Sequence, residues 1–291
     1  MAAYMKLPIP RAGRPISWRF LLFLSLGSLL CLSGCSMRRL AISNAEMVAG
    51  HMLGRYIDLT GEQEQAFVPR LKEHVRWIKE TQLPILRRGL LEAENRLNGS
   101  VTETDVSHLL GLTYTMREAI GSRMAHDAAE LAASMNDQQI ADLEQYLKKS
   151  NETLLKRLKQ TDEDLVKEQS QETVDFAENL AGEFSSDQQR RLLEIFPPGR
   201  ESLETWLRSR QQLHGTIIAV LKQKKTKDEL SGIFLTWATE PYLIRGEPRE
   251  TWEARETMRS KKIAAFIGLL TPQQTSKLKE ELADIAKDLA Q

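Results

Sequence analysis

Two cysteines, Cys31 and Cys35, are the residues of this chain best suited to covalent chemistry, because cysteine supplies the only good sulfur nucleophile. Both lie near the amino terminus. Cys35 follows Ser33 and Gly34, whose small side chains let a protease reach the backbone. These residue types at this spacing suit a modified thiol beside a cleavage site.

Elsewhere, the sequence lacks the usual catalytic and metal-binding patterns. Its five histidines are spread so that none lies three or four residues from another: His51, His74, His108, His126 and His214. There is no H-E-x-x-H, G-x-S-x-G or Walker loop. Carboxylates are abundant but mixed with lysines, whereas acid–base catalysis needs a pocket that shifts a pKa. We therefore expect no enzyme, no cofactor and no metal site.

The segment that positions Cys35 reads as a secretory signal peptide. Residues 1–19 carry four basic side chains and no acidic one, and residues 20–32 form an apolar run of about 13 residues. A membrane-spanning helix needs roughly 20 residues. The run therefore fits the hydrophobic part of a signal better than a transmembrane anchor, although an uncleaved anchor or a chance apolar run are the alternatives.

Leu32-Ser33-Gly34-Cys35 resembles the lipobox of bacterial lipoproteins. The resemblance implies that the Cys35 thiol receives diacylglycerol, that the chain is cut before it, and that the new amine is acylated with a palmitate-like chain. Such chains contribute roughly 0.8 kcal/mol per buried CH₂ to membrane binding. Ser36 is not the aspartate of inner-membrane retention, so for a Gram-negative host we expect the periplasmic face of the outer membrane.

Cleavage before Cys35 would leave 257 of the 291 residues. It removes four basic and no acidic residues, so 36 Lys and Arg face 40 Asp and Glu, a net charge of about −4. This balance is no signature of nucleic-acid binding. With Cys31 removed and Cys35 lipidated, no disulfide or thiolate metal site remains.

The mature chain is predicted to be all-α, an irregular bundle of helical hairpins. Helical spacing of apolar residues recurs throughout, and no run alternates with period two. One long central helix is expected over 136–181, and Pro69 should kink or break the helix that contains it. We divide the chain into a signal peptide at 1–34, a lipidated tether at 35–42 and a helical domain at 43–291. A boundary between two subdomains would fall near 182–200.

One helix-start pattern occurs four times: an apolar residue, a small capping residue, two further positions and then glutamine. The pattern predicts a capping box, in which the cap oxygen accepts an early helical N–H and the glutamine reaches back to the cap. The caps and their glutamines are Thr60 with Gln63, Asn136 with Gln139, Ser185 with Gln188, and Thr271 with Gln274. The repeats either only start helices or mark an ancient duplication.

Two resemblances involve these starts. Leu59-Thr60-x-x-Gln63 and Leu270-Thr271-x-x-Gln274 resemble the L-T-x-x-Q motif of Spy/CpxP-like periplasmic stress proteins, which are helical, need no cofactor and bind unfolded or signalling partners. Separately, a family of proteobacterial lipoproteins classed as a domain of unknown function is resembled by the lipobox together with Asn44-Ala45, the segment 56–63, Trp77 and Leu83-Pro84. That second resemblance implies a helical envelope lipoprotein and no activity.

The segment 237–248 differs from its surroundings because large apolar residues stand beside two prolines and a glycine. Trp237, Tyr242 and Leu243 either pack under a loop or contact a partner. Together, the patterns favour an outer-membrane lipoprotein that binds or scaffolds an unidentified envelope protein or polymer. A Spy-like chaperone or stress adaptor is the alternative, and an envelope hydrolase is a third reading.

Overall fold

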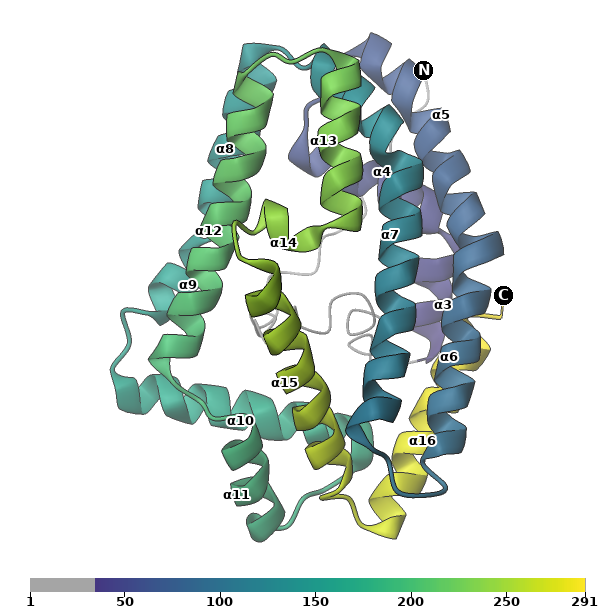
Figure 1. The fold of residues 1–291 in the computed structure, drawn as a ribbon, viewed down its shortest axis with the longest axis vertical. Coiled ribbons are helices and arrows are strands. Elements are labelled where there is room, and N and C mark those ends of the chain that lie inside the picture. Colours follow the sequence, from purple (N-terminus) through teal and green to yellow (C-terminus); the bar gives the residue numbers. More distant parts are fainter. Residues whose placement is uncertain (1–34, 291) are drawn as a thin grey trace.

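The computed structural model describes residues 35–290, which are all-α, as predicted. No strand occurs in this part of the chain (Figure 1). The helices in order are α3 (Cys35–Ser43), α4 (Ala45–Tyr56), α5 (Gly61–Trp77), the π-helix η1 (Ile78–Gln82), α6 (Leu83–Arg96), α7 (Glu103–Ser134), α8 (Asp137–Ser150), α9 (Glu152–Arg157), α10 (Asp162–Ala181), α11 (Ser186–Ile195), α12 (Arg200–Lys222), α13 (Lys227–Thr239), α14 (Pro241–Ile244), α15 (Arg249–Ile267) and α16 (Pro272–Asp288).

The helices form a ring of packed pairs rather than a regular bundle. Figure 1 shows α8 and α12 side by side along one edge, and α7 between α13 and the α5–α6 path along the other. Helices α10 and α11 lie across the base, where α11 contacts α15 and α10 contacts α16. The region enclosed by α6, α7, α10, α15 and α16 is where the candidate site lies.

Helices α7 and α13 make the most extensive helix–helix contact in the described chain. They approach closely because Gly121 on α7 faces Ala238 on α13: a Cβ at Gly121 would lie only 2.6 Å from the Ala238 Cβ. Small side chains at a crossing let two backbones come together without overpacking. This contact fixes α7, which carries one wall of the candidate site.

The expected long helix over 136–181 is instead three helices, so that prediction was wrong. The run ends at Asn151 and again before Thr161, which caps α10 by accepting a hydrogen bond from the Asp164 N–H at 3.1 Å. A local cap of this kind competes with helix continuation. The longest helix is α7, with 32 residues.

Pro69 does not break its helix, so the break that was one of the two predicted outcomes does not occur. Helix α5 runs through it and continues by η1 into α6, so residues 61–96 form one helical path. Buried Gln63, Phe67 and His74 recur at helical spacing along α5 and hold it against its neighbours. Tertiary packing of one face therefore outweighs the backbone hydrogen bond that proline removes.

Residues 35–42, predicted to be a tether, lie within helix α3. The buried guanidinium of Arg38 pairs with Asp288 at 2.9 Å and with Glu281 at 2.7 Å, both on α16. One turn later, Ile42 joins a buried cluster with Leu90 and other residues of α6, α7 and α16. The chain is therefore folded from Arg38 onward.

The predicted signal peptide, residues 1–34, lies outside the described residues. Among residues 35–290, no helix combines the length and the apolar composition that crossing a membrane requires. The segment 182–200, where a subdomain boundary was predicted, contains α11. Leu192 of α11 shares a buried cluster with Val174 of α10 and Leu269 near the carboxyl end.

Candidate functional site

All four repeated helix starts have the geometry of capping boxes. At the first, the Gln63 N–H donates to Thr60 Oγ1 at 3.3 Å, and the Thr60 N–H donates to Gln63 Oε1 at 3.0 Å. The same two hydrogen bonds occur at the starts of α8, α11 and α16. Each box satisfies two backbone N–H groups that a helix start would otherwise leave unpaired.

The four glutamines also meet in two pairs, which sequence reasoning did not anticipate. In the first glutamine pair, Gln139 Nε2 donates to Gln63 Oε1 at 2.7 Å, and Gln63 Nε2 lies 3.3 Å from Gln139 Oε1. Each amide also donates across to the backbone carbonyl two residues before the partner's cap: Gln139 to Asp58 at 2.7 Å and Gln63 to Ser134 at 3.1 Å.

The second glutamine pair repeats this arrangement. Gln188 Nε2 donates to Gln274 Oε1 at 2.7 Å and to the Leu269 carbonyl at 2.9 Å, while Gln274 Nε2 donates to the Glu183 carbonyl at 2.6 Å. Every amide hydrogen of the four glutamines thus has an acceptor inside the fold. These residues join helix starts, α5 to α8 and α11 to α16, and leave no amide donor for a ligand.

The residues singled out as a partner contact lie at the α13–α14 junction. Trp237 is on α13, where its ring packs against Phe234 with centroids 5.4 Å apart. Tyr242 and Leu243 are on the short helix α14; Tyr242 is half-buried, and Leu243 is 43% exposed. The predicted irregular segment therefore contains one helical turn, and its partner role stays a prediction.

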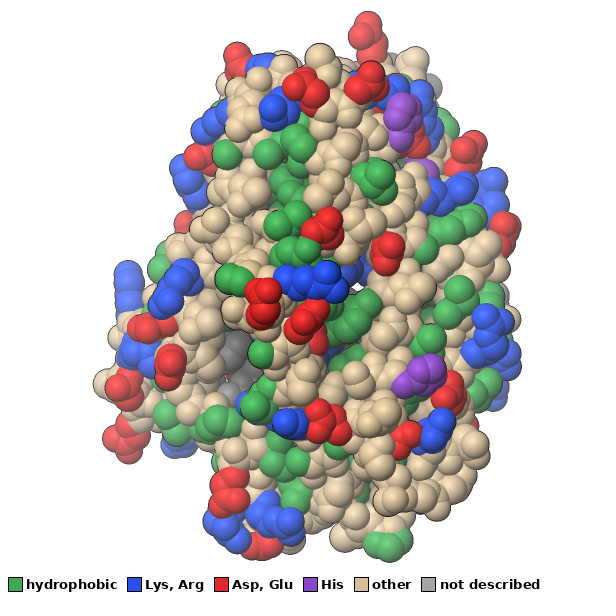
Figure 2. All heavy atoms as spheres, in the orientation of Figure 1, with side chains coloured by type: hydrophobic (Ala, Val, Ile, Leu, Met, Phe, Trp, Pro, Cys, Tyr) green, Lys and Arg blue, Asp and Glu red, His purple; other side chains and the backbone are tan. Residues whose placement is uncertain are grey.

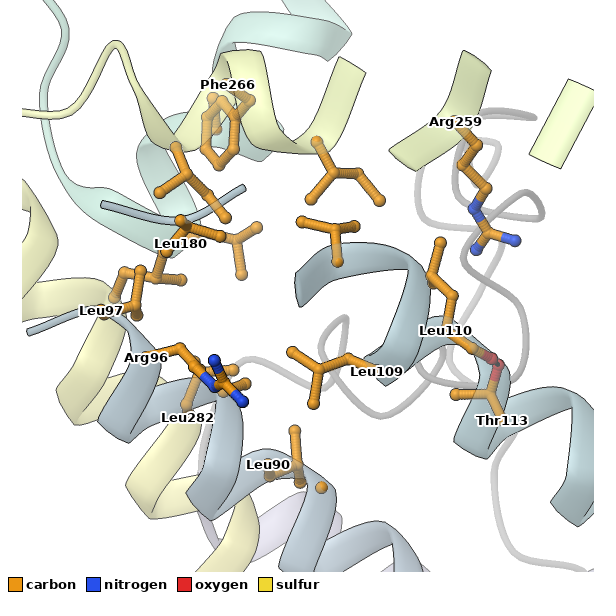
Figure 3. Close-up of a pocket in the computed structure, with 18 of the residues that line it drawn as sticks. Leu90, Arg96, Leu97, Leu109, Leu110, Thr113, Leu180, Arg259, Phe266 and Leu282 are labelled. Carbon is orange, nitrogen blue, oxygen red and sulfur yellow. Dashed lines mark hydrogen bonds between the residues drawn. The ribbon is translucent and has the colours of Figure 1, made fainter. Parts of the chain in front are cut away.

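The feature with the clearest capacity to bind something is an apolar chamber of about 250 Å³. Six helices line it, with Leu192 contributed by α11, and Figure 3 shows side chains of the other five converging: Leu90 from α6, Leu110 from α7, Leu180 from α10, Phe266 from α15 and Leu282 from α16. The chamber is partly open to solvent. Its volume lies between a cavity of about 150 Å³ that holds benzene and pockets of roughly 300–1,000 Å³ that hold drug-sized ligands.

Helical periodicity explains how each wall presents apolar groups. On α7, Val106, Leu109, Leu110 and Thr113 follow the i, i+3, i+4, i+7 spacing that places residues on one helical face. On α15, Arg259, Ile263 and Phe266 are four and three residues apart and also share a face. Such spacing is visible in the sequence, but it indicates burial only. Only the packing of six helices decides that these faces leave a space between them.

The polar groups of the chamber are few, and most are already engaged. The hydroxyls of Thr113 and Thr173 donate to carbonyls of their own helices at 2.7 Å. Arg96 pairs with Asp105 at 2.7 Å, and Glu172 with Arg157 at 2.9 Å. An interior of this composition favours an apolar chain over a polar molecule, because unmatched polar groups lose their hydration there.

Arg259 marks one end of the chamber, near Leu110 and Thr113, whereas Leu180, Phe266 and Leu97 lie toward the other end (Figure 3). Arg259 Nη1 donates to the hydroxyl oxygen of Tyr114 at 3.3 Å and lies 3.5 Å from Glu256. The Tyr114 hydroxyl donates to Glu256. Burial, with the Glu256 carboxylate as a second cause, raises the pKa of Tyr114 to about 12, so the phenol stays neutral at physiological pH.

Chemically, the chamber can hold an apolar group next to a basic end. Within residues 35–290, no three His, Cys, Asp or Glu side chains are placed to hold a metal ion together. Sequence reasoning singled out none of the chamber residues. The available signal was the apolar face of α7 beside the arginines of α15, which could not be matched to each other without the fold.

Comparison with known proteins yields a family but no activity. The model of a family of unknown function, DUF6279, matches residues 55–236, which is more than half of the chain. No curated protein and no solved structure matches. The matched residues include most of the chamber walls, on α6, α7 and α10, and the whole first glutamine pair.

Proposed function

Since the chain belongs to DUF6279, a family of unknown function, we propose from the structure that it is a lipid-anchored envelope protein that binds an apolar ligand without catalysis. The single observation that carries this proposal is the apolar chamber between α6, α7, α10, α15 and α16.

The apolar lining of the chamber supports a ligand. Because the chamber is partly open, water reaches its apolar walls, and apolar surface in contact with water costs free energy that burial would remove. A ligand that fills the chamber removes much of this cost while burying its own apolar surface, at about 25 cal/mol per Å².

The anchor in this proposal is the lipid on Cys35, at the periplasmic face of the outer membrane. Cys35 begins α3, and only three residues later Arg38 is held by Asp288 and Glu281. A lipid at Cys35 would have almost no spacer before the folded domain. The chamber would then stay close to the bilayer, which is the richest local source of apolar ligands.

A neutral apolar fluorophore, N-phenyl-1-naphthylamine, tests the chamber directly. We expect saturable binding of one probe per chain, and at least about tenfold weaker binding in Leu110→Trp, because the indole would occupy the chamber. Leu155→Trp is the matched control, since Leu155 is 43% exposed and remote from the lining. Equal probe binding by both variants, with circular dichroism showing that both are folded, would overturn the proposal.

The anchor has its own test. Intact-mass analysis of protein extracted from membranes should give residues 35–291 plus acyl chains, and this mass should be lost in Cys35→Ser. An unmodified full-length mass would remove the lipoprotein part of the proposal and leave the chamber part standing.

A Spy-like chaperone is the second candidate, and exposed apolar side chains on α3 and α4 favour it. Leu40 is 59% exposed, Met47 64% and Val48 44%. Such side chains could bind an unfolded client, and replacing all three by serine should then abolish suppression of client aggregation. If the native protein suppresses no aggregation at a stoichiometric ratio, this candidate fails.

A further inference from the structure

Four arginines gather at the Arg259 end of the chamber. Arg117 follows Thr113 by one turn of α7, and Arg255 precedes Arg259 by one turn of α15, so both lie beyond the chamber on the same side. Arg245 ends the turn of α14. We call these four residues the arginine cluster. Figure 2 shows basic and acidic side chains next to each other at the centre of this face, over α14 and the start of α15.

Two members of the cluster share two glutamates. Arg255 lies 2.5 Å from Glu247 and 3.7 Å from Glu256. Glu256 also faces Arg259 at 3.5 Å and accepts the hydrogen bond of Tyr114. The two carboxylates therefore neutralise Arg255 and Arg259.

The other two arginines have no such partner. No carboxylate among residues 35–290 lies within ion-pair distance of Arg117 or Arg245. At longer range, Glu256 acts on both arginines, Glu118 on Arg117 and Glu247 on Arg245. The guanidinium of Arg117 lies over the Tyr114 ring, 5.6 Å from its centroid. Burial lowers the pKa of both arginines, and the charge of Arg255 lowers that of Arg245 further.

Both side chains nevertheless remain exposed to solvent. The chamber end thus presents two guanidinium groups without carboxylate partners, each able to donate paired hydrogen bonds to a planar or tetrahedral anion.

We propose that the ligand is an anionic amphiphile with a single acyl chain, whose chain occupies the chamber and whose carboxylate or phosphate headgroup meets Arg117 and Arg245. This inference rests on the proposed function, since it names the ligand class of the same site. Arg259 connects the two parts, because it lines the chamber and belongs to the cluster. An anion here replaces two unpaired positive charges with charge-assisted hydrogen bonds.

The test compares three ligands with the same twelve-carbon chain and different heads: dodecanol, dodecanoate and dodecyl phosphate. Each displaces N-phenyl-1-naphthylamine from the full chain carrying Cys35→Ser. We expect at least one of the two anions to bind about tenfold or more tightly than the alcohol, because charged hydrogen bonds are the stronger ones. The better anion distinguishes a carboxylate from a phosphate headgroup. The preference should fall as salt is added.

The double variant Arg117→Gln/Arg245→Gln should bind dodecanol normally and lose most of the preference for anions. Its matched control is Arg76→Gln/Arg190→Gln, which removes two exposed arginines away from the chamber and should keep the preference. A preference that survives in the first variant would overturn the role of the cluster.

Two outcomes separate this inference from the proposed function. If the alcohol and both anions displace the probe equally well, the headgroup inference fails and the apolar chamber stands. If none of the three ligands displaces the probe, then the proposed function fails as well.

Discussion

The glutamine pairs and the apolar chamber use buried space in opposite ways. In the first glutamine pair, Gln63 and Gln139 are 6% and 5% exposed, and every amide hydrogen has an acceptor. The chamber leaves about 250 Å³ unfilled, and the cluster beside it leaves Arg117 and Arg245 without carboxylate partners. A satisfied polar network adds stability, whereas unfilled apolar space and unpaired charge are what a ligand can complete.

The two glutamine pairs show that one short motif encodes more than a helix start. Their members are 76 and 86 residues apart in the chain, yet both pairs make the same amide–amide and amide–carbonyl contacts. Each motif therefore caps its own helix and docks it onto a second copy of the motif. The recurrence is what a duplicated helix-start unit would produce.

The largest effect on stability is expected from Gln139→Ala, which breaks the first pair. The variant loses a capping box and removes the amide that donates to the Asp58 carbonyl and to Gln63 Oε1 inside the fold, so the free energy of unfolding should fall by about 2–4 kcal/mol. Urea denaturation measures this loss. Gln138→Ala is the control, because Gln138 is exposed and bonds only to Asp142 within its helix. Equal effects of the two substitutions would contradict a structural role for the pair.

A smaller loss is expected from Gln188→Ala in the second pair. Gln188 is only half-buried, so water can reach part of the space that it vacates and satisfy Gln274. We expect about 1–2 kcal/mol by the same measurement. A double-mutant cycle with Gln274→Ala should give a coupling above about 0.5 kcal/mol, and additive effects would mean that the pair adds nothing beyond two caps.

A substitution that fills the chamber should raise the free energy of unfolding, whereas the substitutions in the glutamine pairs lower it. Leu180→Phe, at the end of the chamber away from Arg259, adds apolar volume where there is space and should raise the free energy of unfolding by up to about 1 kcal/mol. The same variant should bind N-phenyl-1-naphthylamine more weakly. Lower stability together with unchanged probe binding would show that the chamber is already filled by the chain itself.

An effect of similar size is expected from Tyr114, but only at alkaline pH. Its pKa is about 12 in the folded protein against 10.0 in the unfolded chain, so the fold favours the neutral phenol. That contribution is complete below pH 10 and is lost as the pH rises from 10.0 to about 12. Allowing for solvent screening, we expect Tyr114→Phe to reduce the alkaline loss of stability by about 1 kcal/mol.

Urea midpoints measured at about pH 9 and about pH 11 for the native protein and for Tyr114→Phe test this expectation. An identical pH dependence in the two proteins would show that Tyr114 ionises as readily in the fold as in the unfolded chain.

The helix starts could be read from the sequence because their interactions are local. Thr60 and Gln63 lie within one turn, so their types and spacing indicate the capping box without further information. The all-α class followed from helical periodicity in the same way. By contrast, the break at Thr161 and the continuity through Pro69 depend on which of two local tendencies tertiary packing favours. The break at Thr161 was not predicted, and a break at Pro69 was one of two predicted outcomes and does not occur.

The sequence by itself determined the helical class, the four capping boxes and the candidate lipidation site at Cys35, because each depends on residues close together in the chain. Only the tertiary structure decided that Gln63 meets Gln139, that six helices leave a chamber, and that Arg117 and Arg245 stand at its end with no carboxylate at ion-pair distance. The reason is that periodicity marks which face of a helix is buried, whereas the partner of that face, and the space left between partners, depend on residues distant in the chain.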